Sequence, residues 1–399
     1  MKRFNAIIVA LAVFAGIAVA GPIDFEFESS YDGSQQPAAG FVPDDLEQNP
    51  APRPLLVVAH FMGGDRYTAQ KQGYYEEAAK RGWLVVSPEL HGKNSKGGKI
   101  SCASLEAQHD ILDSIAYMRK NYPVDTRRIY IAGRSMGGMM TQIMIAKYPD
   151  LFAAGVAGQG CSDITRLDEF SAAVAKAIPQ ECGDDPFEYQ RRSSIYYARN
   201  FAYAPLIIWH GTNDGLVDAA QSKRLYDAIV SYQPYAIPVF WLPNGSHLEE
   251  NYMPEWICDQ LENYRTSCDW PDMPFRWFPE LDLITDESKA FFYLDVKLAD
   301  ENRFGTIKTS LAPKEGEFDR SMIMAGCNSE EMKPVVMTIN VSNIAEVTVN
   351  FDNMPEPLRP AEVILVADKD SQVALYRVIN GSKEPMPAER ITRTAPMND

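Results

Sequence analysis

A serine in a glycine-rich turn between a strand and a helix is the feature of this sequence that most restricts its fold. Residues 129–132 read Ile-Tyr-Ile-Ala, a buried-strand pattern, and residues 133–138 read Gly-Arg-Ser-Met-Gly-Gly. A helical stretch follows at once. So tight a turn leaves almost no room for neighbouring side chains, which explains why Gly133 and Gly137 flank Ser135. The pattern predicts that Ser135 stands at the carboxyl end of a sheet as a candidate nucleophile.

Short apolar strands alternate with helical stretches on both sides of this turn, as a parallel α/β fold requires. The predicted strands are residues 55–59, 83–86, 129–132, 153–157, 206–209 and 239–242. The predicted helices are residues 67–81, 105–122 and 136–147, one that Asp218 begins, and one that opens at Pro254. The expected fold class is therefore α/β, with a mostly parallel sheet and helices on both of its faces.

The last third of the chain has a different pattern of apolar and polar residues. Apolar and polar residues alternate with period two in residues 335–342 and 347–352, and further strand candidates lie at 363–366 and 373–379. This alternation predicts a small antiparallel β domain. We expect a division into a signal peptide (1–20), an α/β catalytic domain (21–270) and a β-rich accessory domain (271–399).

The first twenty residues carry the pattern of an export signal. Lys2 and Arg3 precede an uninterrupted apolar run, and Ala-Val-Ala at residues 18–20 is a small-x-small cleavage site. The run is shorter than the roughly 20 apolar residues that a spanning helix needs. We therefore expect a secreted or periplasmic protein that begins at Gly21 and has no membrane span after cleavage.

Export would place the six cysteines in an oxidising compartment, where thiols pair. Loop length favours pairing of Cys161 with Cys182 and of Cys258 with Cys268, which leaves Cys102 for Cys327. None of them has the Cys-x-x-Cys spacing of a zinc site. Structural disulfides are the expectation.

The charge balance restricts the partners. The chain has 38 Lys and Arg against 54 Asp and Glu, a formal net charge of −16. An acidic surface repels phosphate backbones, which argues against nucleic acid as a partner. The expected partner is a small or polymer-linked substrate, and the sequence sets no oligomeric state.

A nucleophilic serine needs a base and an acid, which in this fold follow it in the order serine, acid, histidine. His247 comes directly after the last predicted strand. The acid should lie in the loop after residues 206–209, which contains Asp214 at a turn and Asp218 before a helix. Asp218 is better placed as a helix N-cap, so Asp214 is the predicted acid.

The oxyanion that forms during acyl transfer also needs hydrogen-bond donors. The backbone N–H of Met136, directly after the candidate nucleophile, is one expected donor. The second should come from the loop after residues 55–59, where Phe61 is the first choice and Met62 the alternative.

The other four histidines receive lesser roles. His60 and His91 end strands at the same edge of the sheet and are candidates to line the pocket, whereas His109 and His210 are interpreted as structural. No two histidines and a carboxylate share a metal-ligand spacing, so we expect neither a catalytic metal nor a cofactor.

The turn at 133–138, the segments 124–129 and 210–214, and His247 together resemble the α/β-hydrolase superfamily. The likeness is greatest to prolyl oligopeptidase-like and dienelactone hydrolase-like esterases, and residues 32–37 are similar to their first strands. The sequence departs from the family pattern in two ways. Residues 60–64 read His-Phe-Met-Gly-Gly, where the family has glycine soon after the histidine. The segment before the first core strand is too short for the propeller of true prolyl oligopeptidases.

The resemblance implies a serine hydrolase that cleaves carboxylic esters through an acyl-enzyme, with acetyl and feruloyl esters of plant polymers as the candidate substrates. A prolyl oligopeptidase-like peptidase is the alternative, and a non-catalytic binding protein on the same fold ranks lower. We further expect the segment 159–203 to cap the acyl pocket. Lys93, Lys96 and Lys99 are interpreted as part of a solvated loop on its rim.

Overall fold

The computed structural model describes residues 20–46, 48–93, 100–232, 238–247, 254–266, 278, 280–313, 335–368 and 371–393. The predicted signal peptide lies outside these residues, except for Ala20, as does most of the predicted lysine loop. In the part of the chain that is described, the helices are all too short or too polar to cross a membrane.

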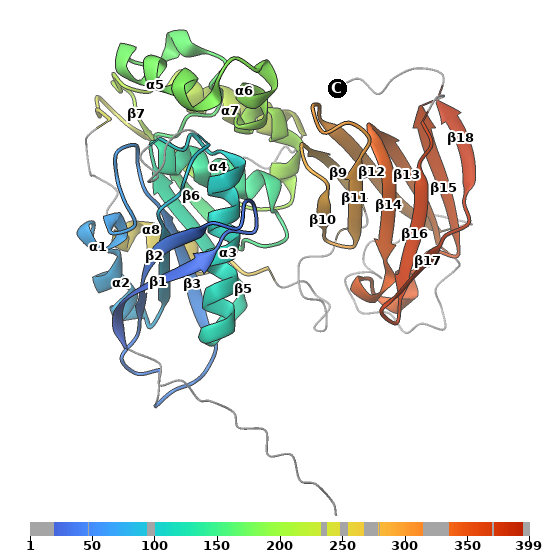
Figure 1. The fold of residues 1–399 in the computed structure, drawn as a ribbon, viewed down its shortest axis with the longest axis horizontal. Helices are drawn as coiled ribbons and strands as arrows, with labels where there is room; N and C mark the ends of the chain where they lie inside the picture. Colours follow the sequence, from blue (N-terminus) through green and yellow to red (C-terminus); the bar gives the residue numbers. More distant parts are fainter. Residues whose placement is uncertain are drawn as a thin grey trace, which may run out of the picture.

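An eight-stranded sheet organises the first part of the chain (Figure 1). Its strands lie in the order β1-β2-β4-β3-β5-β6-β7-β8. Their bounds are β1 Gly21–Glu28, β2 Gln35–Val42, β3 Arg53–Ala59, β4 Leu84–Pro88, β5 Val124–Arg134, β6 Ala154–Gly158, β7 Leu206–Gly211 and β8 Val239–Leu242. The pairs from β4 to β8 are parallel, whereas β1 and β2 form an antiparallel hairpin at one edge. The expected α/β fold with a mostly parallel sheet is confirmed.

Helices cover both faces of this sheet because its central strands are apolar on both sides. Leu55 and Val57 of β3 face one core, which α3, α4 and α7 complete, while Leu56 and Val58 face a second core with α2 and α8. The helices are α1 Thr68–Lys71, α2 Tyr74–Arg81, α3 Leu105–Asn121, α4 Met136–Lys147, α5 Ala172–Cys182, α6 Pro186–Arg191, α7 Ala220–Tyr232 and α8 Pro254–Leu261.

One predicted helix is wrong in its extent. Residues 67–81 were expected to form a single helix, but they form α1 and α2 with a break between them. Gly73 lies in the break with φ of 85°, a left-handed conformation that no helix interior contains. Gly82 ends α2 as predicted, again with a left-handed backbone.

The segment between β6 and β7 contains α5, α6 and two short 3₁₀ helices, η1 Leu167–Glu169 and η2 Ser194–Ala202. Ser171 accepts a hydrogen bond from the Val174 N–H at the start of α5, and Asp185 accepts one from Phe187 at the start of α6. Both are N-caps of the usual chemistry. We call residues 159–203 the cap segment.

The last third of the chain forms two five-stranded sheets that share one core (Figure 1). One sheet has the order β10-β11-β14-β16-β17 and the other β18-β15-β13-β12-β9. The bounds are β9 Glu280–Thr285, β10 Lys289–Phe291, β11 Leu294–Leu298, β12 Gly305–Pro313, β13 Val335–Ser342, β14 Ile344–Asn350, β15 Glu362–Asp368, β16 Ala374–Ile379, β17 Ser382–Pro385 and β18 Glu389–Arg393, with η3 Phe351–Asn353 and η4 Glu356–Leu358 between β14 and β15. We refer to this unit as the C-terminal sandwich.

Most neighbours in the sandwich are antiparallel, as the period-two pattern predicted. The pairs β13–β15, β14–β16 and β15–β18 are parallel. The alternating burial of β13, with every second residue inside, places residues such as Met337 and Ile339 in the shared core. Alternation reveals which face of a strand is buried, but it is the same for parallel and antiparallel neighbours.

The sandwich contacts the α/β part through β9, the turn that follows it, and the segments around Phe292 and Phe304. Asn200 of η2 bonds to the backbone of Ile284 in both directions, with N···O distances of 2.9 Å. Lys147, the last residue of α4, is buried against Asp286 and Glu287. The helix that starts at Ser135 therefore ends on the sandwich.

Candidate active site

Ser135 occupies the sharp turn between β5 and α4. Its backbone has φ 58° and ψ −122°, an unfavourable conformation for a residue with a side chain. The Ser135 N–H donates to the Gly158 carbonyl of β6 at 2.9 Å, and its carbonyl accepts from Met139 at 2.9 Å. These bonds hold the strained residue between the sheet and the first turn of the helix.

The glycines of the turn are required by close backbone contacts. A Cβ on Gly137 would lie 2.1 Å from the carbonyl oxygen of Ala59, and one on Gly133 would lie 2.4 Å from the carbonyl oxygen of Gly137. Since real Cβ atoms do not approach within 3.0 Å, a side chain at Gly137 would push α4 away from β3, and one at Gly133 would push α4 away from β5. The glycine spacing thus fixes Ser135 against the loop that follows β3.

His247 and Asp214 form a short hydrogen bond. His247 Nδ1 lies 2.6 Å from Asp214 Oδ2, and the Asp214 side chain is fully buried. Asp214 Oδ1 accepts the N–H groups of Leu216 and Val217 at 2.9 and 3.0 Å. The second aspartate, Asp218, instead accepts the N–H of Ala220 at the start of α7.

His210, interpreted from the sequence as structural, is an additional partner of Asp214. Its Nε2 lies 3.3 Å from Asp214 Oδ2 and 3.0 Å from the Val217 carbonyl, while its Nδ1 lies 2.7 Å from the Ser222 hydroxyl. Burial alone would raise the pKa of Asp214, but the hydrogen bonds from His210 and His247 outweigh it and hold that pKa well below its usual range. The carboxylate is therefore ionised beside the His247 ring. The sequence signal was their spacing, since His210 lies in β7 four residues before Asp214.

A cavity of about 390 Å³ lies over Ser135, a size typical of sites for small-molecule ligands. His247, Phe61 and Met136 also line it, so the cavity brings together four of the five predicted site residues. Asp214 lies behind His247. Met136 is the first residue of α4. Phe61 follows His60, whose carbonyl oxygen would lie 3.0 Å from a Cβ on Gly137.

The remaining cavity wall is mostly apolar. It is formed by Met62, Cys102, Arg134, Met139, Cys161, Ile164, Val174, Ile178, Leu216 and Val217. Val174 and Ile178 come from α5, so the cap segment closes the cavity on one side. Arg134 has its guanidinium 5.5 Å from the centre of the Phe61 ring.

His60 and His91 are not among the residues that line this cavity. His60 is buried and bonds to the carbonyl oxygens of Phe61 and Glu89, at 2.9 and 2.7 Å. His91 Nδ1 lies 2.7 Å from the buried carboxylate of Asp110. Both rings therefore fix loops around the cavity. His109 lies at the surface of α3, where its Nδ1 is 2.7 Å from the Ser30 hydroxyl.

The predicted disulfide between Cys161 and Cys182 is wrong in this structure. Both are buried free thiols, as are Cys102 and Cys258. Short separation lowers the entropy cost of closing a loop, but it does not orient the side chains. Cys161 lines the cavity directly after β6, whereas α5 carries Cys182 to its far end.

Burial raises the pKa of Cys161 and of Cys258 to about 12, so these thiols are poor nucleophiles. The partners predicted for Cys258 and Cys102, Cys268 and Cys327, lie outside the described residues.

Comparison with known families finds a match over the part of the chain that holds this site. Residues 74–266 match the prolyl oligopeptidase family, which confirms the expected resemblance. The match includes Ser135, Asp214 and His247, and it ends before the C-terminal sandwich.

Two curated relatives that the chain matches are esterases. The chain is 35% identical to an acetylxylan esterase of Coprinopsis cinerea over 198 residues, which are 45% of this chain and 50% of that protein. It is 27% identical over 195 residues to feruloyl esterase B of Talaromyces funiculosus, covering 45% of this chain and 53% of the relative. The chain spans about half the length of the curated relatives that it matches.

Solved structures support the fold. A candidate dipeptidyl aminopeptidase IV of Bacteroides ovatus superposes with a TM-score of 0.51 at 18% identity, covering 61% of this chain and 35% of the other. A puromycin hydrolase superposes with a TM-score of 0.50 at 18% identity, covering 61% and 38%. At this identity the likeness concerns the fold alone.

Proposed function

We propose that this protein, whose residues 74–266 are a prolyl oligopeptidase family domain, is a serine hydrolase that cleaves carboxylic esters. The observation that carries the proposal is the 2.6 Å contact between His247 and Asp214, with His247 and Ser135 on the wall of one cavity. A nucleophile, a base and an ionised acid are the parts that acyl transfer needs.

In the proposed mechanism, His247 accepts the proton of the Ser135 hydroxyl as Oγ attacks the ester carbonyl. Asp214, held by its backbone and histidine partners, fixes the His247 ring and stabilises its protonated form. The N–H groups of Met136 and Phe61 are the proposed donors to the oxyanion. His247 then protonates the leaving alcohol, and water releases the acid from Ser135 by the same route in reverse.

Esters are preferred to peptides as substrates for two reasons. Two curated relatives are esterases, at 35% and 27% identity, whereas the two solved structures described above are 18% identical and carry only the fold. The cavity wall is also largely apolar, which suits an acyl group better than a charged peptide terminus.

Acetyl and feruloyl groups of plant polymers are the proposed acyl groups, following the names of these relatives. A signal peptide at residues 1–20 and export from the cell fit such a substrate, since a polymer cannot enter the cell. The sandwich is proposed as an accessory domain, with the division near residue 270.

The test combines active-site labelling with a substrate panel. Wild-type protein should react with a fluorophosphonate probe and hydrolyse nitrophenyl esters, while Ser135→Ala should do neither. Ser231→Ala, which changes an exposed serine of α7, is the matched control and should behave as wild type. Equal labelling of Ser135→Ala and wild type would refute the assignment of the nucleophile, and faster turnover of aminoacyl amides than of esters would favour the peptidase.

A further inference from the structure

Two consecutive arginines connect the C-terminal sandwich to the wall of the cavity. Arg191, the last residue of α6, reaches the turn between β9 and β10. Its Nε lies 2.9 Å from Asp286 Oδ2, and its Nη2 donates to the Asp286 carbonyl at 3.1 Å. Two bonds to one residue fix the guanidinium plane as well as its position.

Arg192 bonds instead to Ser101 and to Glu181 of α5, which are neighbours of cavity-lining residues. Its side chain is only 2% exposed. One Nη1 hydrogen bond reaches the carbonyl of Ser101 at 3.2 Å, and the same atom lies 3.5 Å from Glu181 Oε1. Ser101 precedes Cys102, which lines the cavity. Glu181 belongs to α5, the helix that contributes Ile178 to the same wall.

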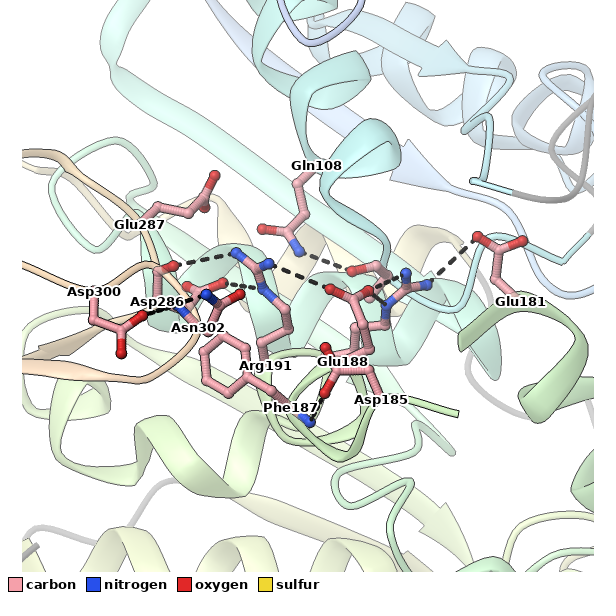
Figure 2. Close-up of polar contacts among 12 residues, drawn as sticks. Gln108, Glu181, Asp185, Phe187, Glu188, Arg191, Asp286, Glu287, Asp300 and Asn302 are labelled. Atoms are coloured by element: carbon pink, nitrogen blue, oxygen red, sulfur yellow. Dashed lines mark hydrogen bonds and ion pairs between the residues drawn. The ribbon is translucent and has the colours of Figure 1, made fainter. Parts of the chain in front are cut away.

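Glu188 joins the two arginines. Its Oε1 accepts from Arg191 at 3.3 Å, and its Oε2 accepts from Arg192 Nη2 at 2.6 Å. Figure 2 shows Asp286, Arg191, Glu188 and Glu181 in one row. Arg192 pairs with both Glu188 and Glu181, so the charges along the row alternate in sign. The row begins in the sandwich and ends on α5.

Because its members are buried, this row of charged side chains has one fixed geometry. Asp286 and Glu181 are each 1% exposed. A buried ion pair that loses one partner leaves an uncompensated charge, so the members are held in one arrangement. The turn that holds Arg191 also holds Lys147, whose Nζ lies 2.8 Å from Asp286 Oδ1. The sandwich therefore bonds both to the helix of Ser135 and to the cap segment that faces it.

We propose that Arg191 and Arg192 are positioning residues, through which the C-terminal sandwich sets the width of the cavity and thereby selects bulky apolar acyl groups over acetyl. This inference rests on the proposed ester hydrolysis. A cavity of about 390 Å³ is far larger than an acetyl group, which fills only the region beside Ser135. A large acyl group must also contact Val174 and Ile178 on α5. A displaced α5 therefore costs the large substrate its contacts and leaves the small one unaffected.

The experiment compares Arg191→Met with wild type on two nitrophenyl esters that share a leaving group, the acetate and the cinnamate. We expect kcat/KM for the cinnamate to fall about tenfold, the size of effect that modest changes in an apolar pocket produce, mainly through KM. The value for the acetate should stay within about twofold of wild type. Arg191→Lys, which keeps the charge, should restore part of the cinnamate activity.

Arg199→Met is the matched control. Arg199 of η2 also pairs with the sandwich, at 3.2 Å from Asp282 Oδ1, but it does not bond to Glu188, Glu181 or the cavity wall in the described structure. Its ratio of cinnamate to acetate turnover should equal that of wild type. If the ratio of cinnamate to acetate turnover fell as far in Arg199→Met as in Arg191→Met, loosening the interface would be sufficient to change the substrate preference. The inference would then be wrong.

Glu188→Gln tests the same row if Arg191→Met does not fold, which circular dichroism would reveal. It keeps the shape of the side chain and weakens both arginine contacts, so the ratio should shift in the same direction. A folded Arg191→Met or Glu188→Gln protein with an unchanged ratio refutes the inference alone. Wild-type protein that hydrolyses neither ester refutes the proposed function and the inference with it.

Discussion

Replacing Gly137 by alanine should disable the enzyme through a single methyl group. The added Cβ would lie 2.1 Å from the Ala59 carbonyl oxygen, 2.8 Å from its carbonyl carbon and 3.0 Å from the His60 carbonyl oxygen. All three are backbone atoms at the end of β3, so no side chain can rotate away to make room.

The strand and the helix must therefore separate by roughly 1 Å, and a misplacement of this size costs about 10²-fold in rate. The displaced segment also carries Phe61, a proposed oxyanion donor, and loss of one such donor costs about 10²–10³-fold in kcat. We expect kcat for nitrophenyl acetate to fall at least about 10²-fold. Overpacking should lower the free energy of unfolding by about 1–3 kcal/mol.

Gly215→Ala is the control for this prediction. Gly215 follows Asp214, but a Cβ there has no atom within 4 Å. It should keep activity within about twofold of wild type. The assay is steady-state hydrolysis, together with the rate of fluorophosphonate labelling and urea unfolding. A Gly137→Ala protein with wild-type kcat and labelling rate would refute the argument that this close contact positions Ser135.

Three further predictions follow from charged groups. Asp214→Asn should lower kcat by about 10⁴-fold, since an amide cannot stabilise the protonated His247 ring, and steady-state kinetics with unchanged circular dichroism would test this. The depressed pKa of Asp214 means that its carboxylate stabilises the fold above its unfolded pKa of about 3.9, and that this contribution is lost as pH falls below that value. In urea titrations between about pH 5 and pH 2, wild type should therefore lose more stability than Asp214→Asn, and parallel losses would contradict the reasoning. Burial, aided by nearby Lys147, lowers the pKa of Lys289 to about 7. Between about pH 7 and pH 10, Lys289 is therefore protonated in the unfolded chain but neutral in the folded protein. Because the unfolded chain binds more protons in this range, the stability of the fold rises with pH. Lys289→Met should remove that rise, so it should increase Tm more at pH 7 than at pH 10. An equal change in Tm at pH 7 and pH 10 would contradict this prediction.

Several features were predictable because they depend on local sequence. The turn around Ser135 needs glycine at fixed positions, and the structure explains each by a backbone contact. The pairing of His247 with Asp214 followed from chain order, because the loops after successive parallel strands meet at one edge of the sheet. Asp218 was separated from Asp214 by its position at a helix start, and it does accept a hydrogen bond from the first residue of α7.

Other features could not be predicted because they depend on how side chains and strands are oriented in the folded chain. The contact of His210 with Asp214 depends on how the loop folds back on its own strand. The disulfide prediction failed because sequence spacing does not contain side-chain direction. The parallel pairs in the sandwich were hidden because a strand alternates in the same way beside either kind of neighbour.

The sequence by itself determined the α/β class, the strained turn at Ser135 and the order of the candidate triad, since hydrophobic period, glycine positions and chain order are all local properties. Only the tertiary structure decided what surrounds that triad. Arg191 and Asp286 lie 95 positions apart in the chain, yet their ion pair ties the sandwich to the cap segment. Such a contact exists only after both units have folded, because two charges can be buried together only when the packed elements around them exclude water.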